Sequence, residues 1–161
     1  MEAEEMTDQA SDTTRQQLTE GLLAYGATFT ELGRLFAVAL GVHTTDAFAL
    51  LEITAAEERG TSLSPAQLGK RIRLSSGAMT ALLNRLERAG YVTRTRDSAD
   101  RRVVTLHATA EAKRRGNEFF DPINARQDAI LASRPPELLR EFEKLLRDLQ
   151  AGLNEVAAEQ Q

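Results

Sequence analysis

The stretch LSSGAMTALLNRLERAG, Leu74–Gly90, decides how the rest of the chain is interpreted. At 3.6 residues per turn, a helix over these residues places Met79, Leu82, Leu83 and Leu86 on one side. The opposite side collects small, polar and basic residues: Gly77, Thr80, Ala81, Asn84 and Arg88, with Arg85 on the flank. The pattern predicts a helix with one side for packing and one side for a partner.

Residues with capping chemistry mark both ends of this helix. The hydroxyl of Ser75 or Ser76 can accept a hydrogen bond from an early amide, and Gly90 can take the left-handed conformation that ends a helix. Capped amphipathic helices occur in most helical proteins, so the neighbouring segments must decide the function.

A short helix is predicted immediately before this stretch. Ser64 can cap it, and Pro65 suits its first position because the missing amide hydrogen costs nothing there. Only Arg73, Leu74 and Ser75 separate the end of its pattern, at Ile72, from the next helix. Two helices joined by so tight a turn are a helix-turn-helix candidate, whose second helix would enter the major groove of DNA.

After Gly90 the hydrophobic period changes from 3.6 to 2. Residues 91–96 and 103–107 are rich in Val, Thr and Leu, and a polar segment joins them, which predicts a β-hairpin. A hairpin directly behind a helix-turn-helix is a wing. Its tip carries Arg101 and Arg102, which could reach phosphates or a narrow minor groove.

The charge distribution favours the same interpretation. The chain carries a net charge of −4, yet residues 70–102 hold nine basic residues against three acidic ones, which leaves +6 in that segment. The remainder is therefore strongly acidic. A basic middle suits a phosphate partner, and the acidic remainder limits indiscriminate binding.

Composition excludes several classes of function. The chain of 161 residues is 42% hydrophobic and 27% charged, has no cysteine and has only two histidines. We find no glycine-rich phosphate loop and no paired carboxylates, so we predict that the protein is not an enzyme and uses no cofactor. His43 near Asp46, and His107 near Glu111, lack a third ligand, and we predict no metal site. Without a long apolar run or a signal peptide, a cytoplasmic protein is expected, with no membrane partner.

The flanking segments predict helices that are longer than a small winged domain needs. Residues 1–12 contain five acids and few large apolar groups, which predicts a disordered acidic arm. Residues 13–43 carry an apolar stripe that ends near Gly41, and a second helix, capped by Thr44 or Thr45, ends near Arg59.

The C-terminal part, residues 109–158, is predicted to hold two further helices. Thr109 caps the first, in which Pro122 predicts a kink or break near residues 120–121, and Pro136 opens the second. The apolar stripe of the last helix is wide, as in a helix that buries itself against another helix or subunit. Packing within one chain could also explain it. We favour a homodimer formed by residues 13–43 and 109–158, with residues 44–108 as the winged helix-turn-helix region.

The order of these elements resembles the MarR family of transcriptional regulators, winged helix-turn-helix proteins that act as homodimers. The resemblance extends from about Thr13 to Val156. It is most specific over residues 74–87, over Gly90-Tyr91-Val92, and over Asp100-Arg101-Arg102 followed by Thr109. It implies a mainly α fold with a small β-hairpin wing, a winged core, and N- and C-terminal dimerisation helices.

The resemblance also implies site residues. Double-stranded DNA with a pseudo-palindromic site would be contacted by Ser75, Ser76, Gly77, Thr80, Ala81, Asn84, Arg85 and Arg88 from the helix and by Arg101 and Arg102 from the wing. This sequence has small residues at three positions of the helix where the family often has larger ones: Gly77, Ala78 and Ala81. Fewer base contacts are then available, and specificity would depend more on the shape of the DNA. Ala108 replaces the leucine that usually precedes the capping threonine.

MarR-like proteins often bind small aromatic compounds between their dimerisation helices and the winged region. In this sequence that crevice would be lined by Tyr25, Phe29, Phe36, His43 and Phe48, although any one of these aromatic residues is more often simply part of a core. The leading hypothesis is therefore a repressor that a small aromatic ligand releases from DNA. The alternative is a winged module for protein interaction, or for ligand or metal binding, without specific DNA binding.

Overall fold

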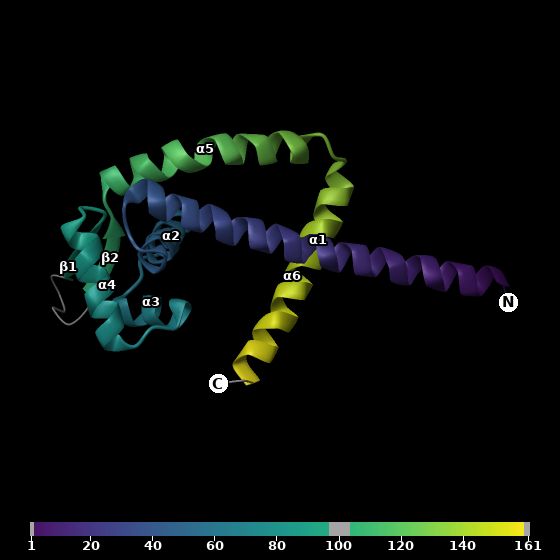
Figure 1. The fold of residues 1–161 in the computed structure, drawn as a ribbon, viewed down its shortest axis with the longest axis horizontal. Helices are drawn as coiled ribbons and strands as arrows, with labels where there is room; N and C mark the ends of the chain where they lie inside the picture. Colours follow the sequence, from purple (N-terminus) through teal and green to yellow (C-terminus); the bar gives the residue numbers. More distant parts are fainter. Residues whose placement is uncertain (1, 97–103, 160–161) are drawn as a thin grey trace. The chain divides into compact units, whose positions relative to one another are not determined.

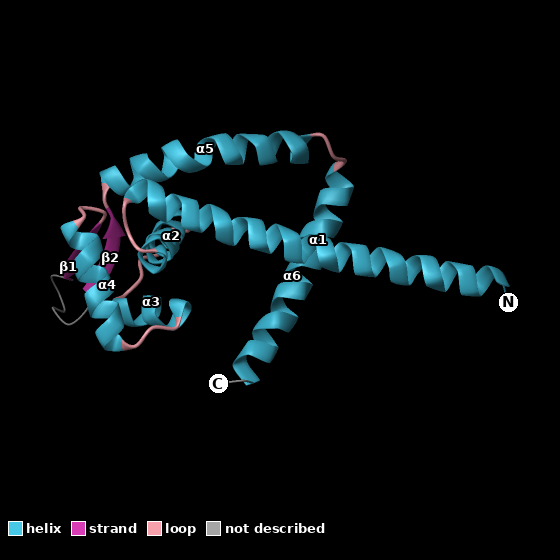
Figure 2. Cartoon of the chain, in the orientation of Figure 1, coloured by secondary structure: helices cyan, strands magenta, loops and turns pink. Residues whose placement is uncertain are grey.

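The computed structural model describes residues 2–96 and 104–159, with side chains from Asp12 onward. Over these residues the chain forms helices and one two-stranded antiparallel sheet (Figures 1 and 2). Their order is α1 (Glu2–Leu40), α2 (Thr44–Glu58), α3 (Pro65–Ile72), α4 (Ser76–Arg88), β1 (Val92–Arg96), β2 (Val104–Ala108), α5 (Ala110–Ala132) and α6 (Pro136–Glu159). The predicted fold class, mainly helical with a hairpin wing, is confirmed.

The chain divides into two compact units. The first covers residues 1–116 and contains α1 to β2 with the start of α5, and the second covers residues 117–161. The division falls inside α5, several residues after the boundary at 108 that the sequence suggested.

The core of the first unit surrounds α2. This helix packs against α1, α3, α4 and β2. The largest fully buried apolar side chains in the unit are Phe36, Leu50, Ile53, Leu68, Leu82, Leu83, Leu86, Val92 and Leu106. They come from every element from α1 to β2, so α4 and the wing share one hydrophobic core with the end of α1.

Local capping chemistry accounts for most of the helix boundaries. Gly41, with φ +70°, follows the end of α1, and Gly90, with φ +77°, follows α4. The Thr109 hydroxyl accepts a hydrogen bond from the Ala112 amide at 3.1 Å and caps α5. At α2 the prediction was wrong by one position, because the N-cap is His43, which offers no side-chain cap.

The N-terminal prediction needs a correction. Residues 2–12 do not form a separate disordered arm in the structure but belong to α1. Once a helix is nucleated, each added residue gains a hydrogen bond, so the helix can extend through these residues.

Of the kink or break predicted near residues 120–121, the break does not occur, because α5 runs continuously from Ala110 to Ala132 with Pro122 inside it. Proline removes one backbone hydrogen bond, and Pro122 is exposed, so water can serve the freed carbonyl. As predicted, α6 begins at Pro136, and no described residue of α6 is buried.

Among the described residues, no single helix is long and apolar enough to span a membrane. Only α1 and α2 taken together meet that test, and they are bent by 102° at the break between them.

The close approach of α1 to α2 depends on Gly33. A Cβ at this position would lie 2.6 Å from Cε1 and Cζ of Phe48. We predict that Gly33→Ala lowers the free energy of unfolding by about 1–3 kcal/mol, because the Phe48 ring must move out of a packed site. Gly116→Ala is the control, since its Cβ meets open space. It should stabilise α5 by about 0.5–1 kcal/mol. Urea unfolding measures both, and equal stabilisation would contradict the packing argument.

Candidate nucleic-acid interface

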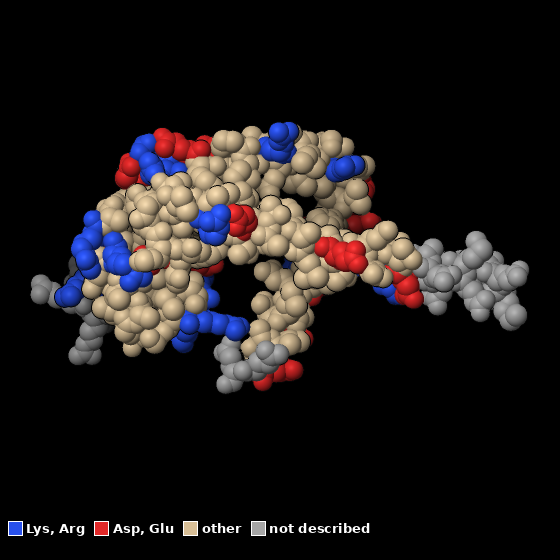
Figure 3. Space-filling view, viewed as in Figure 1, with Lys and Arg blue, Asp and Glu red and all other residues tan. Residues whose placement is uncertain are grey.

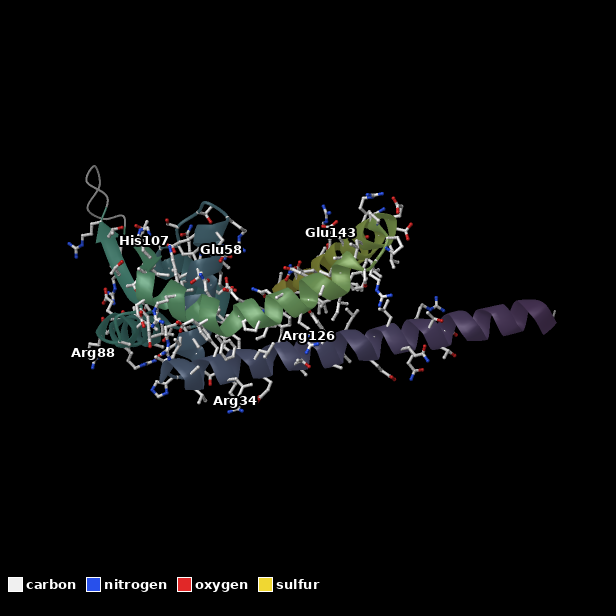
Figure 4. All side chains as sticks on the ribbon, turned by 90° about the horizontal axis from the view of Figure 1, so that it is seen from above. Arg34, Glu58, Arg88, His107, Arg126 and Glu143 are labelled. Atoms are coloured by element: carbon white, nitrogen blue, oxygen red, sulfur yellow. The ribbon has the colours of Figure 1, made fainter. Side chains whose placement is uncertain are left out.

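The two sides of α4 differ as the sequence predicted. Met79, Leu82, Leu83 and Leu86 are buried. The remaining side is exposed and consists of Ser76, Gly77, Thr80, Ala81, Asn84 and Arg88. Figure 4 shows Arg88 pointing away from the helix at this end of the unit. Thus the buried side fixes the helix in the core and leaves the small and polar side available.

The turn between α3 and α4 is set by local hydrogen bonds. Ser64 and Gln67 form a reciprocal capping box at the start of α3. Arg73 takes the left-handed conformation with φ 53°, and the Leu74 amide donates to the Gly69 carbonyl at 3.0 Å. Ser75 caps α4 by accepting from the Ala78 amide at 3.3 Å. The short linker therefore gives a tight turn, as predicted.

The hydroxyl of Thr80 is partly used within α4. It donates to the Ser76 carbonyl at 2.9 Å, so its lone pairs and its methyl group remain on the exposed side. Thr80 can therefore accept hydrogen bonds or contact apolar groups.

Arg85 has a partner that sequence reasoning missed. Its Nε lies 2.8 Å and its terminal nitrogen 2.6 Å from the two carboxylate oxygens of Asp46 at the start of α2. Asp46 is only 1% exposed and is the one buried charged residue in the described part of the chain. A buried carboxylate needs a charged, hydrogen-bonding partner, and the hydrogen bond raises the pKa of Arg85. The guanidinium predicted to face DNA is bound to α2 through two of its nitrogens, while the Arg85 side chain stays 39% exposed.

The wing is an antiparallel pair in which Val92 faces Ala108 and Arg96 faces Val104. An isolated bridge adds Leu63 beside Leu106, whose amide donates to the Leu63 carbonyl at 2.8 Å. Arg101 and Arg102, the predicted wing contacts, lie outside the described residues.

Arg94 on β1 is a second residue that the sequence analysis passed over. One terminal nitrogen lies 2.8 Å from Asn84 Oδ1 and 3.0 Å from Glu87 Oε2, both on α4. The wing and the exposed side of α4 are therefore joined by a charged hydrogen-bonding group. Neither residue spacing nor periodicity indicated this pairing, because it requires knowing that β1 turns back along α4.

Basic side chains gather around these elements. Figure 3 shows Lys and Arg along the edge of the first unit that holds α4 and β1. Of the residues there, Arg88 and Arg96 are exposed. Positive charge from the basic segment found in the sequence thus lies along one edge of the unit, where it can attract a polyanion.

Comparison with known proteins agrees with this geometry. Residues 40–103 match the model of the MarR family. The winged region of this chain is therefore similar to the MarR family. Two curated relatives from Bacillus subtilis (strain 168) align with about half of the chain. The uncharacterised regulator YcgE is 39% identical over 88 residues, which cover 55% of this chain and 54% of YcgE. The transcriptional repressor YetL is 32% identical over 87 residues, which cover 54% of this chain and 52% of YetL.

A solved structure extends the likeness in fold. A MarR family protein from Bacillus stearothermophilus superposes with a TM-score of 0.64 at 24% identity, covering 89% of this chain and 97% of that chain. The chain spans about half the length of the curated relatives it matches. Both relatives are named as regulators of transcription rather than as enzymes.

The predicted ligand-binding residues of this chain have different surroundings. Phe36 is buried in the core, and Phe48 packs against Gly33. Tyr25 and Phe29 are exposed on α1, with ring centroids 5.2 Å apart. A pocket of about 320 Å³ is lined by Gly41, Val42, His43, Asp46, Arg85 and Ala89, and so includes only His43 of the predicted set.

The base of the wing holds a polar cluster around His107. Its Nδ1 lies 3.0 Å from Glu57 Oε1 and its Nε2 lies 3.0 Å from the Thr95 hydroxyl. Lys113 Nζ, from the first turn of α5, lies 3.0 Å from Glu57 Oε2. His107 thus joins the wing to α2. No group of three or more metal-binding side chains occurs in the described part of the chain.

Glu57 gives the wing base a dependence on pH. Burial would raise the pKa of Glu57, but interactions with Lys113 and His107 outweigh burial and lower it. A lowered pKa means that Glu57 stabilises the fold above its unfolded-state pKa of about 4.3 and loses this contribution as the pH falls through the folded value.

We predict that the difference in unfolding free energy between the native chain and Glu57→Gln is largest near pH ~7 and shrinks toward pH ~3. The neighbouring exposed Glu58→Gln is the control and should show no comparable trend with pH. Urea unfolding at a series of pH values measures both. A constant difference for Glu57→Gln would show that its carboxylate charge does not stabilise the wing base.

Proposed function

We propose that this chain is a sequence-specific, double-stranded DNA-binding regulator of transcription, and a repressor. The observation that supports the proposal is that α4 has a buried apolar side and an exposed side of small and polar residues. A tight turn joins this helix to α3. A helix presented in this way can enter the major groove, while a wing beside it reaches the adjacent backbone or minor groove. The name of YetL as a repressor supports the direction of regulation.

The proposed contacts are divided by chemistry. Gly77 and Ala81 allow close approach of α4 to the groove, and Thr80 and Asn84 offer hydrogen bonds to base edges. Contacts to DNA phosphates would come from the two ends of α4, through Ser75, Ser76 and Arg88. The wing would contribute contacts to the DNA through Arg101 and Arg102. Arg85 is removed from the base-reading set, because its guanidinium is bound to Asp46.

We also propose that the chain works as a homodimer. The last helix exposes Leu138, Phe142, Leu145, Leu146, Leu149, Leu153 and Val156, and α1 exposes Leu23, Tyr25, Phe29 and Val38. Stripes of this width on helices with no buried residue, as in α6, favour burial against a second copy. A two-fold dimer would place two α4 helices on half-sites about 34 Å apart, which implies a pseudo-palindromic site.

Release of the DNA by a small aromatic ligand remains a prediction. Its support is the exposed aromatic pair Tyr25 and Phe29 on a proposed dimerisation helix. Such a ligand would act by preferring a dimer whose two α4 helices are wrongly spaced for the DNA.

The DNA-binding proposal is tested by mobility-shift titration of a duplex from upstream of the protein's own gene. Native protein should bind it in preference to an unrelated duplex. Arg101→Ala/Arg102→Ala should weaken binding to both duplexes and reduce the slope of log K against log salt by about 2, because two phosphate contacts are lost. Thr80→Ala should instead change the preference between duplexes.

The matched control is Arg140→Ala/Arg147→Ala on α6, which removes the same charge outside the winged region. Its salt slope should stay near the native value. Absence of a shift at low salt, or a shift without sequence preference, would refute the proposed regulator and favour the protein-interaction alternative.

The dimer proposal is tested by Leu149→Glu in the apolar stripe of α6. A charge buried in a helix interface is costly, so light scattering after size exclusion should show a monomer where the native chain gives a dimer. Ala151→Glu, on the opposite side of the same helix, is exposed and should leave the dimer intact. A native monomer, or dissociation by both variants alike, would contradict an interface on this stripe.

A further inference from the structure

We propose that Arg94 determines what Asn84 recognises: it engages one lone pair of the Asn84 oxygen and leaves the NH₂ group fully available to DNA, which favours a base with acceptors, guanine first, over adenine or cytosine. The inference rests on the proposed function of α4 as a major-groove helix. It assigns a specificity role to Asn84 and a positioning role to a wing residue outside the hairpin tip.

The geometry begins with the position of Arg94. Its terminal nitrogen lies 2.8 Å from Asn84 Oδ1 and 3.0 Å from Glu87 Oε2. Arg94 and Glu87 are both about one-third exposed or less, at 29% and 35%, whereas Asn84 is exposed. The carboxylate of Glu87 holds the guanidinium beside α4, and the guanidinium in turn holds the amide of Asn84.

Hydrogen-bond chemistry fixes the orientation of that amide. A guanidinium carries only donors, whereas an asparagine side chain carries one acceptor oxygen and one donor NH₂ group. An amide turned the other way would place donors against donors. Asn84 must therefore give its oxygen to Arg94, and its two N–H donors point to the other side of the amide.

This orientation limits which base Asn84 can recognise. A free asparagine pairs with adenine through both groups, accepting from N6 and donating to N7. With one lone pair of Oδ1 bound to the guanidinium, the acceptor half of that pair is weakened, and the two N–H donors are the groups left fully available. Guanine offers two adjacent acceptors, O6 and N7, and thymine offers O4. Cytosine presents a donor, which the NH₂ group cannot bind.

The nearby cation reinforces the same preference. Arg94 places a positive charge beside the Asn84 amide, and guanine concentrates two acceptor atoms on its major-groove edge. Arg96, two residues further along β1, lies on the same face of the strand and is exposed. No contact between Arg96 and Asn84 is recorded among the described residues, so Arg96 provides a matched arginine on the same strand.

The test starts by selecting bound sequences from a library of random DNA duplexes with the native protein. Affinities for the selected duplex, and for versions with each base pair replaced, are then measured for the native chain, Asn84→Asp, Arg94→Met and Arg96→Met. In the native protein one position per half-site should depend on Asn84 and prefer guanine by about tenfold over adenine.

The variants separate orientation from charge. Asn84→Asp removes the donors and adds an acceptor, so the preference at that position should move toward cytosine. Arg94→Met frees the amide to turn, so adenine should rise to equal or exceed guanine there. Arg96→Met removes the same charge from the same strand, and should weaken all duplexes alike while leaving the base preference unchanged.

The outcomes distinguish this inference from the proposed function. If the native protein enriches no sequence, the proposed regulator itself fails. If it selects a site but prefers adenine at the position that depends on Asn84, the inference is overturned. The same follows if Asn84→Asp leaves every base preference unchanged, a result that stands even if Arg94→Met fails to fold.

Discussion

The bidentate ion pair between Asp46 and Arg85 is the interaction on which the orientation of the exposed side of α4 depends. Asp46 is buried at the start of α2, where an unpaired carboxylate would be costly, and Arg85 reaches it from the flank of α4. Two parallel hydrogen bonds define direction as well as distance, so they set how α4 is turned about its axis. Since the apolar side of α4 is buried in the same core, the exposed side can point in only one direction.

Two side-chain hydrogen bonds connect the end of α1 with the residue before β1 and with α5. The Tyr91 hydroxyl donates to the Leu40 carbonyl at 3.1 Å, and Arg115 on α5 donates to the Ala39 carbonyl. These carbonyls belong to the last turn of α1, where no intrahelical amide is available to them. One side chain from within the winged region and one from α5 therefore complete the helix, and its end cannot move without changing their hydrogen bonds.

Those features of the fold that arise from short segments could be predicted from sequence. Ser64, Ser75, Thr109 and Gly90 act through hydrogen bonds or backbone conformation within a few residues, and all four behave as predicted. The partners of the arginines could not be predicted in this way. Asp46 and Arg85 are 39 positions apart, so only the folded core brings them together. A basic residue on a helix flank looks the same in sequence whether it faces a phosphate or a buried carboxylate.

The same distinction explains why α4 reads DNA with so few free side chains in the proposed function. Arg85 is bound to α2, and Asn84 is bound through its oxygen to Arg94, so two of the polar side chains of α4 are already engaged within the fold. Such commitment removes the rotamer entropy that a free side chain would lose on binding. In the proposed function, a helix with small residues and pre-oriented polar groups therefore makes fewer base contacts, but the geometry of each contact is better defined. Its specificity has to come from a few fixed donors and from the shape of the groove.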